Sequence, residues 1–275
     1  MTFRLVPANQ FKLEQLVAVY NQTRQDYMVP MPMSATRLEE YIRIYDIDLA
    51  QSLVAIDGDD LIGLGMLGIR GHRSWITRLG LRADNRSRGI GRAMVKGLLE
   101  NSDQLTIPKN MLEVIKGNQA ARRLFHKLGF RESRELLIMR RTAKQAPKPR
   151  MDCIPINEDE MQNLLEERKT RQAWTNQTES LSKLDKKSGF HVVKKNLQGW
   201  MIYQAKPNKI SRLVFRTRRG DPVETTDHLL AQLHSRHPGL PAQIENIPAN
   251  DQHLPALKKH GYVEVFRRIE MVRYA

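Results

Sequence analysis

Arginine and glycine are concentrated in one short stretch of the chain, where Arg86, Arg88 and Arg92 alternate with Gly89 and Gly91. Glycine lets the backbone turn so that successive N–H groups point into one concavity. If a helix begins here, its first N–H groups have no partner within the helix, and its dipole adds partial positive charge. Together with the arginines, this pattern predicts an anion site suited to a pyrophosphate. The same residues also suit an ordinary helix start, so both interpretations stay open.

The elements expected around this stretch place it between a strand and a helix. Apolar residues predict a strand over 75–81, and helical spacing runs over 89–100. The other expected strands cover 3–6, 52–56, 61–69, 111–115 and 130–139, and the other expected helices cover 11–20, 35–45 and 119–128. Many strands with a few intervening helices predict an α/β fold with a mixed sheet.

A second motif begins at Asn118 and runs Asn-Gln-Ala-Ala-Arg-Arg-Leu-Phe-His-Lys-Leu-Gly-Phe. It resembles the second cofactor motif of the GNAT acyltransferases, Asn-x-x-Ala-x-x-Leu-Tyr-x-x-x-Gly-Phe. The earlier Arg86-x-x-Gly89-x-Gly91 resembles the first motif of that family, Gln/Arg-x-x-Gly-x-Gly/Ala. The two motifs occur in the family's order and spacing, and the resemblance covers residues 1–142. It implies two tandem GNAT-like domains, each a mixed, mainly antiparallel sheet flanked by helices, with a weaker second copy.

The resemblance implies acetyl-CoA as the cofactor. It assigns the pyrophosphate to the backbone of Arg86, Ser87, Arg88, Gly89, Ile90, Gly91 and Arg92. It assigns the pantetheine arm to the strand residues Leu79, Gly80 and Leu81, to Asn118 and to Phe125. A backbone N–H of Leu79 or Gly80 would polarise the thioester carbonyl. Catalysis would be direct attack by an amine on the thioester, aided mainly by positioning.

Phe125 departs from the family pattern, which commonly has Tyr at this position to protonate the leaving thiolate. A phenyl ring has no proton to donate, so either the general acid is absent here or Phe125 only packs against the cofactor. The expected strand 75–81 contains no carboxylate that could act as a base, and Asp84 just beyond it suits a surface turn. The sequence therefore assigns no catalytic residue.

The acceptor amine is expected near the connection between the first two helices, which lines the acceptor pocket in the resembled family. Asp26 could hold an amine and Tyr27 could hydrogen-bond to it, while methionines in the same stretch offer an adaptable apolar wall. The alternative is a proline-rich loop that only packs on the sheet.

A proline-containing basic stretch at 143–150 predicts a linker between a GNAT domain at 1–142 and a degenerate one at 151–275. Residues 115–139 align with 247–271 at a constant offset of 132, which indicates a tandem duplication unless the matches are coincidental. The counterpart of the cofactor loop lies near 215–223, where Gly220 is the one glycine, Pro222 lacks an N–H, and Asp221 would repel phosphate. We therefore expect the second domain to lack the cofactor site.

Composition limits the classes of protein that fit. The chain has 275 residues and one cysteine, Cys153, which excludes an internal disulfide and any cysteine-based zinc site. Its longest apolar run is too short for a membrane span, no secretory signal is evident, and we expect a cytoplasmic protein with no metal. The formal net charge of +15 favours anionic partners, including nucleic acid, but no nucleic-acid-binding motif is present.

The function predicted from these residues is an acetyl-CoA-dependent N-acetyltransferase that acts on a primary amine of unspecified identity. The alternative is a catalytically impaired acyl-CoA-binding regulatory protein, which Phe125 and the missing base would explain. The sequence leaves the acceptor, the oligomeric state and the role of the second domain open.

Overall fold

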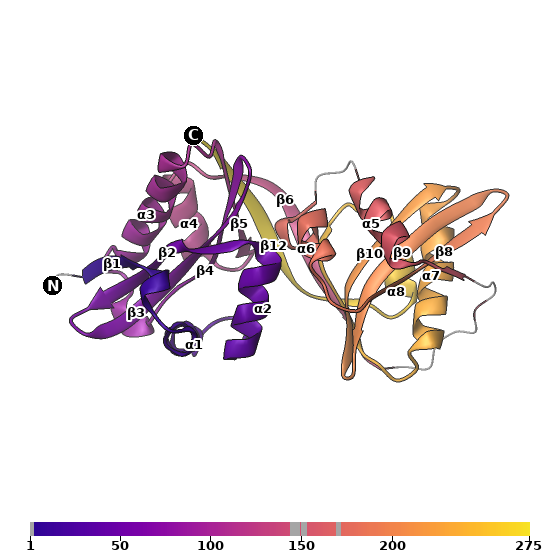
Figure 1. The fold of residues 1–275 in the computed structure, drawn as a ribbon, viewed down its shortest axis with the longest axis horizontal. Helices are drawn as coiled ribbons and strands as arrows, with labels where there is room; N and C mark the ends of the chain where they lie inside the picture. Colours follow the sequence, from indigo (N-terminus) through magenta and orange to yellow (C-terminus); the bar gives the residue numbers. More distant parts are fainter. Residues whose placement is uncertain (1–2, 144–148, 150–152, 169–171) are drawn as a thin grey trace. The chain divides into compact units, whose positions relative to one another are not determined.

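The computed structural model describes residues 3–143, 149, 153–168 and 172–275, and it forms two compact units (Figure 1). The first unit comprises Met1–Ser133 and Glu270–Ala275, and the second comprises Arg134–Ile269. The linker expected at 143–150 lies mostly outside the described residues, so the division of the chain at that point stays a prediction. Within the described part, no helix is long and apolar enough to cross a membrane.

The first unit contains five of its own strands and receives the end of the chain's last one. Its strands are β1 (Phe3–Pro7), β2 (Ile47–Asp57), β3 (Asp60–Arg70), β4 (Arg73–Leu81), β5 (Lys109–Ile115) and the end of β12 (Val263–Tyr274), in the order β1-β2-β3-β4-β5-β12. Its helices are α1 (Leu13–Gln22), α2 (Ala35–Tyr45), α3 (Ile90–Gln104) and α4 (Gln119–Lys127). The first four strands pair antiparallel, whereas β4 and β5 pair in parallel across the helix α3 that connects them.

Helices cover both faces of the first unit's sheet (Figure 1). The Trp75 ring of β4 lies 5.7 Å from the Tyr45 ring, so this face of the sheet packs against α2. Leu79 joins a buried cluster with Ile90 and Met94 of α3, which lies on the opposite face. Side chains of β4 therefore contribute to both layers of the core.

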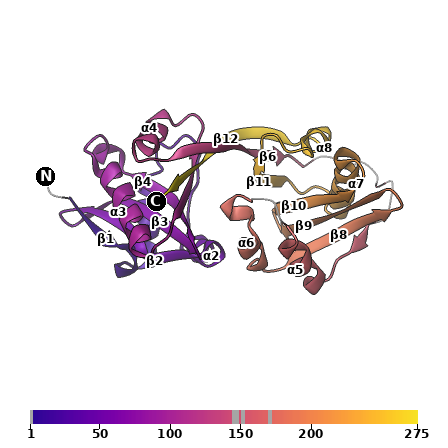
Figure 2. The same ribbon diagram turned by 90° about the horizontal axis from the view of Figure 1, so that it is seen from above.

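The second unit repeats the same succession of strands and helices (Figure 2), with α7 as long as α3 and the other three helices shorter than their counterparts. Its strands are β6 (Arg131–Arg141), β7 (Ile154–Pro155), β8 (Lys187–Lys194), β9 (Leu197–Lys206), β10 (Lys209–Arg219), β11 (Ala242–Pro248) and the beginning of β12, in the order β12-β6-β11-β10-β9-β8-β7. Its helices are α5 (Glu158–Glu166), α6 (Thr178–Ser182), α7 (Pro222–Arg236) and α8 (Leu254–Lys259). The strands β10 and β11 are parallel and are connected through α7, as β4 and β5 are through α3.

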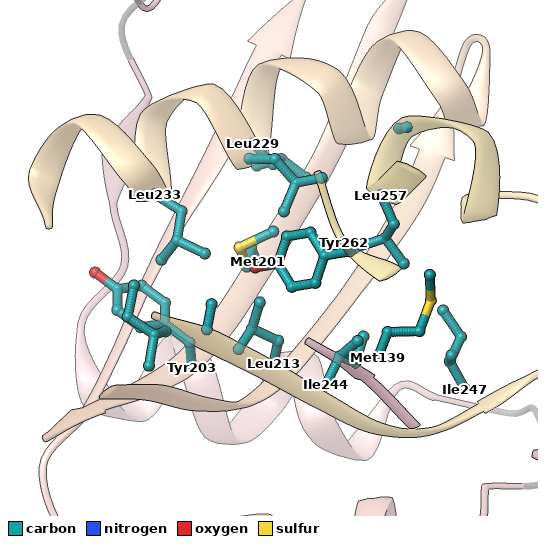
Figure 3. Packing of buried hydrophobic residues seen from close by; sticks show 14 of the residues in the cluster. Met139, Met201, Tyr203, Leu213, Leu229, Leu233, Ile244, Ile247, Leu257 and Tyr262 are labelled. Carbon is teal, nitrogen blue, oxygen red and sulfur yellow. The ribbon is translucent and has the colours of Figure 1, made fainter. Parts of the chain in front are cut away.

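The core of the second unit lies between the sheet and α7 (Figure 3). Leu229 and Leu233 of α7 point toward Met201 and Tyr262 in one buried cluster. The chain around Tyr262 also preserves the predicted repeat, because Gly129 after α4 and Gly261 after α8 have φ angles of 86° and 83°. The predicted α/β fold with mixed and mainly antiparallel sheets flanked by helices is confirmed.

The second unit is inserted in sequence between two parts of the first. Most of β6 belongs to the second unit although β6 directly follows the first, and Glu270–Ala275 at the end of the chain belong to the first. The backbone N–H of Ala275 donates to the carbonyl of Pro108 at 2.9 Å. This hydrogen bond fixes the end of β12 beside β5. The first unit's sheet is therefore completed by a segment that follows the whole second unit in sequence.

Candidate functional site

The start of α3 is open in the way that the sequence predicts. Gly89 is its N-cap residue with a φ angle of 80°, and no side chain bonds to the first N–H groups of the helix. A Cβ atom added at Gly89 would meet nothing within 4 Å. The loop therefore needs glycine for its left-handed conformation and leaves a free concavity over the positive end of a helix of 15 residues.

The three arginines of the loop differ in their availability. Arg88 donates to Asp57 at 2.9 Å, and Arg86 donates to Asp26 at 2.7 Å, so carboxylates within the first unit balance both charges. Arg92 is exposed and makes no ion pair among the described residues. Two of the three arginines that the sequence places at the anion site are therefore paired with carboxylates in this structure.

The strand β4 has an open edge beyond its pairing with β5. The parallel pairing ends at Ile76 and Leu112. Beyond that point Gly80 pairs with β3, while the Leu79 carbonyl accepts a hydrogen bond from Arg24 at 2.9 Å. The next carbonyl on this side belongs to Leu81 and accepts from Arg86 at 3.1 Å. Leu79 and Leu81 therefore direct their backbone groups into the space where β4 and β5 separate.

Gly80 is required by a close approach of α1. A Cβ atom at this position would lie 2.5 Å from the Thr23 hydroxyl oxygen, which follows directly after α1. The Thr23 hydroxyl donates to the Tyr20 carbonyl at 2.7 Å and is therefore fixed in place. Of the two predicted donors for a thioester carbonyl, Leu79 thus has the outward-facing backbone, and Gly80 serves the packing of α1.

A β-bulge in β4 places two consecutive side chains on one face of the sheet. Leu64 pairs with Gly80 and Met66 pairs with Thr77, so two residues of β4 oppose one residue of β3. Arg78 within the bulge has a φ angle of 51°. As a result, Thr77 and Arg78 both face α2.

Tyr41 of α2 is the centre of the polar cluster on this face. Its hydroxyl lies 2.7 Å from the Thr77 hydroxyl, and the Arg78 guanidinium lies 4.3 Å from its ring centroid. Arg78 also donates to the Tyr20 hydroxyl at 2.9 Å. Burial raises the pKa of Tyr41, the positive charge of Arg78 opposes this shift, and the negative charge of Glu113 adds to it.

Glu113 is the carboxylate that sequence reasoning missed. It lies on β5, one residue beyond the last β4–β5 pair, and is half-buried. Glu113 lies outside the expected strand 75–81, and the other residues of its own expected strand, 111–115, are apolar. A single charged residue inside the expected strand 111–115 was the available signal.

The residues of the second motif have two structural roles, since Asn118 caps α4 and Phe125 lies in the hydrophobic core. The Asn118 side-chain oxygen accepts from the Ala121 N–H at 3.1 Å and caps α4. The Asn118 amide nitrogen has no hydrogen-bond partner among the described residues. Phe125 is 6% exposed and meets Phe130 edge-on at 6.0 Å, as expected of a packing residue.

Asp26 and Tyr27, the expected acceptor residues, both lie beside arginines. The Arg86 guanidinium holds the pKa of Asp26 below its usual range through a direct hydrogen bond. The Arg24 guanidinium lies 4.2 Å from the Tyr27 ring centroid. The structure therefore brings the expected acceptor residues to the β4 edge, with Asp26 engaged by the loop itself.

The counterpart site in the second unit is closed. The Asp221 carboxylate accepts from the Glu224 N–H at 2.7 Å, and Pro222 occupies the first turn of α7. A Cβ atom at Gly220 would collide with the Asn196 carbonyl and lie 3.3 Å from the Leu197 Cα. The start of α7 is thus capped by its own side chain and covered by the β8–β9 hairpin.

A search of family models matches residues 17–130 to the acetyltransferase (GNAT) family. The matched range contains both motifs and lies within the first unit. A search of curated protein sequences finds no significant match.

Solved structures share the fold over nearly the whole chain. A tandem GNAT protein from the clavulanic acid biosynthesis pathway is 14% identical, with a TM-score of 0.69 and coverage of 99% of this chain and 98% of its own. A GCN5-related N-acetyltransferase from Sphaerobacter thermophilus is 13% identical, with a TM-score of 0.73 and coverage of 99% and 95%. A structure described as a putative acetyltransferase from Pyrococcus horikoshii is 14% identical, with a TM-score of 0.66 and coverage of 100% and 89%. At these identities the likeness concerns the fold alone.

Proposed function

We propose that this chain, whose first unit belongs to the GNAT family, is an acetyl-CoA-dependent N-acetyltransferase that acts on a primary amine. The observation that carries the proposal is the open start of α3 at Gly89, next to a β4 edge that β5 leaves uncovered. An anion site and a strand edge that the neighbouring strand leaves unpaired are what a diphosphate joined to an extended amide chain requires.

The residues around Gly89 fit the diphosphate of acetyl-CoA. The free space over Gly89 lets an anion approach the first N–H groups of α3, and Arg92 is exposed beside them. A Cβ atom added at Gly91 would lie 3.5 Å from the Leu81 side chain, which is an ordinary van der Waals contact between the helix start and β4. We assign the diphosphate to the backbone of residues 86–92 and to the Arg92 side chain.

The edge of β4 fits the pantetheine arm and the acyl group. When bound, acetyl-CoA supplies an acyl group activated as a thioester. The Leu79 backbone faces the open side of the strand, so its N–H is the donor we assign to the thioester oxygen. Asn118 has an amide nitrogen that can donate to the arm, and Phe125 contributes packing only.

Proton transfer from the amine falls to a carboxylate on β5 in this proposal. Glu113 lies where β5 separates from β4 and can accept the proton that an ammonium must lose before attack. Asp26 and Tyr27 line the approach of the amine. Since Phe125 offers no proton, the departing thiolate takes its proton from water.

A catalytically impaired acyl-CoA-binding regulator is the second candidate. The observation in its favour is the buried phenyl ring of Phe125, which leaves the family's usual general-acid position without a hydroxyl. Both candidates bind the same ligand and differ in turnover alone.

Release of free CoA from acetyl-CoA should be followed with a panel of primary amines, polyamines, aminoglycosides and basic peptides. Steady release with at least one amine, and an acidic limb of the kcat/KM profile that disappears in Glu113→Gln, are expected of the enzyme. Tight CoA binding without turnover across the whole panel would identify the regulator instead. Absence of CoA binding would contradict both.

A further inference from the structure

The segment after α1, residues 23–28, crosses the open edge of β4. Thr23 packs on Gly80, and Arg24 bonds to the Leu79 carbonyl. Farther along, Met28 reaches Gly117, just past the end of β5, where an added Cβ would lie 2.7 Å from the Met28 methyl carbon. We call residues 23–28 the crossing segment. It spans the two strands at the point where they separate.

Arg86 joins the crossing segment to the loop before α3. Its two terminal nitrogens each donate to a different oxygen of Asp26, and one of them also donates to the Leu81 carbonyl at 3.1 Å. Such a two-point pair is the strongest geometry that a guanidinium and a carboxylate can adopt. Both side chains are still partly open to solvent, at 41% for Arg86 and 49% for Asp26. The pair is therefore formed but accessible to a competing anion.

Arg86 cannot serve Asp26 and a diphosphate fully at the same time. The loop that carries Arg86 is the one to which the proposed function assigns the diphosphate, and a diphosphate carries more charge than one carboxylate. A guanidinium that turns from Asp26 to phosphate leaves Asp26 as an unpaired carboxylate on the crossing segment. This carboxylate would then stand beside Leu81, two residues along β4 from Leu79, or roughly 7 Å away.

We propose that Arg86 changes partners when the diphosphate of acetyl-CoA is bound, and that the Asp26 carboxylate released in this way binds an ammonium group of the acceptor. The proposal rests on the proposed function. A carboxylate within about 4–6 Å of an amine favours its charged form, which cannot attack a thioester. The ammonium on Asp26 is therefore a second group, and the acceptor is a diamine or polyamine whose other amino group reaches the acyl carbon.

Calorimetry with CoA and 1,4-diaminobutane tests the exchange without relying on turnover. For the full chain we expect CoA to tighten diamine binding at least 5-fold, because CoA frees Asp26. Asp26→Asn keeps the shape of the side chain and removes its charge. This variant should bind CoA about 2–5-fold more tightly, because Arg86 no longer has to leave an ion pair with Asp26 before it contacts the diphosphate. It should also lose the CoA-dependent gain in diamine affinity.

The matched control is Glu132→Gln. Glu132 forms a comparable ion pair with Arg122, with a nitrogen–oxygen distance of 2.6 Å, and this pair does not lie at the β4 edge. This control variant should leave both affinities unchanged. Unchanged or weaker CoA binding in Asp26→Asn would overturn the exchange of Arg86. Diamine affinity that is the same with and without CoA, or equal to that of 1-aminobutane, would overturn the assignment of Asp26. Failure of the proposed function is distinguishable, because the unaltered chain would then bind no CoA, or would bind CoA without releasing it from acetyl-CoA with any amine of the panel.

Discussion

The starts of α3 and α7 occupy equivalent positions in the two units and differ in almost every property that matters for an anion. At α3 the chain approaches through residues 82–89, Gly89 is open, and no side chain caps the helix. At α7 only Gly220 and Asp221 separate strand from helix, and the Asp221 carboxylate already bonds to the Glu224 N–H. The same fold thus carries one helix start that is free to bind and one that is satisfied by its own residues.

The second unit keeps the same fold around a helix start that its own residues satisfy. Asp at an N-cap and Pro in the first turn are both favourable for a helix. The second unit therefore has a helix start optimised for stability, whereas the first unit leaves N–H groups unsatisfied. We propose that the second unit serves the first by completing its strand order and has no cofactor site of its own.

The largest expected effect comes from closing the open helix start. Gly89→Asp places bulk and negative charge where phosphate must approach, and it should weaken CoA binding by more than about 100-fold, measured by calorimetry. Gly71→Asp is the matched control, because Gly71 also has a positive φ angle and open space around its Cβ position. Equal affinities in the two variants would remove the phosphate site from α3.

The next effect concerns the end of β12, which belongs to the first unit. A fragment of residues 1–143 lacks Glu270–Ala275, which belong to the first unit and include the fully buried Met271 and the buried Val272. Loss of their burial should lower the free energy of unfolding by on the order of 4 kcal/mol. Thermal unfolding with and without a peptide of residues 263–275 would measure this. A fragment as stable as the full chain would show that β12 adds nothing to the first unit.

Acid should weaken the second unit through two buried histidines. Burial, together with the charge of Arg141, lowers the pKa of His234 to about 3, and burial also lowers the pKa of His260. In the unfolded chain these histidines take up protons below about pH 6.5, but in the folded chain they do so only at lower pH. The free energy of unfolding should therefore fall as the pH is lowered, by on the order of 2–3 kcal/mol at pH 4.

Hydrogen exchange, followed separately for peptides of each unit, would measure this loss. His234→Gln should flatten the pH dependence of α7. A second unit whose protection is constant from pH 7 to pH 4 would contradict the assignment of neutral histidines.

The smallest effect is expected from removing the cap of α7. Asp221→Ala leaves the Glu224 N–H without its partner and should cost about 1 kcal/mol of stability in the second unit. Because the start of α7 is also covered by the β8–β9 hairpin, CoA affinity and stoichiometry should not change. A second CoA bound by this variant would mean that Asp221 alone closes the site.

The sequence predicted what local pattern determines. Apolar periodicity predicts α2 with the limits that the structure has. Periodicity and the glycines together also predict that a strand, a loop and a helix succeed one another around Gly89, as the structure shows. Asp221 and Pro222 lie at the second helix start, as the sequence indicates, and the lack of a cofactor site there stays a prediction. These features depend on neighbours in sequence, which is why they can be predicted.

Contacts between distant residues were not predictable in this way. The bulge at Arg78 depends on its register with β3, and the pairing of Arg86 with Asp26 joins residues 60 positions apart. The place of Glu270–Ala275 in the first unit depends on how two complete sheets share their last strand. Each of these needs the tertiary fold, and each changes which side chains are available at the site.

The stoichiometry of CoA binding to the full chain tests the central claim most directly. A calorimetric titration should give one site per chain, and that site should disappear in Gly89→Asp while remaining in Asp221→Ala. Two sites per chain, or one site that survives Gly89→Asp, would contradict the assignment of the cofactor to the open start of α3.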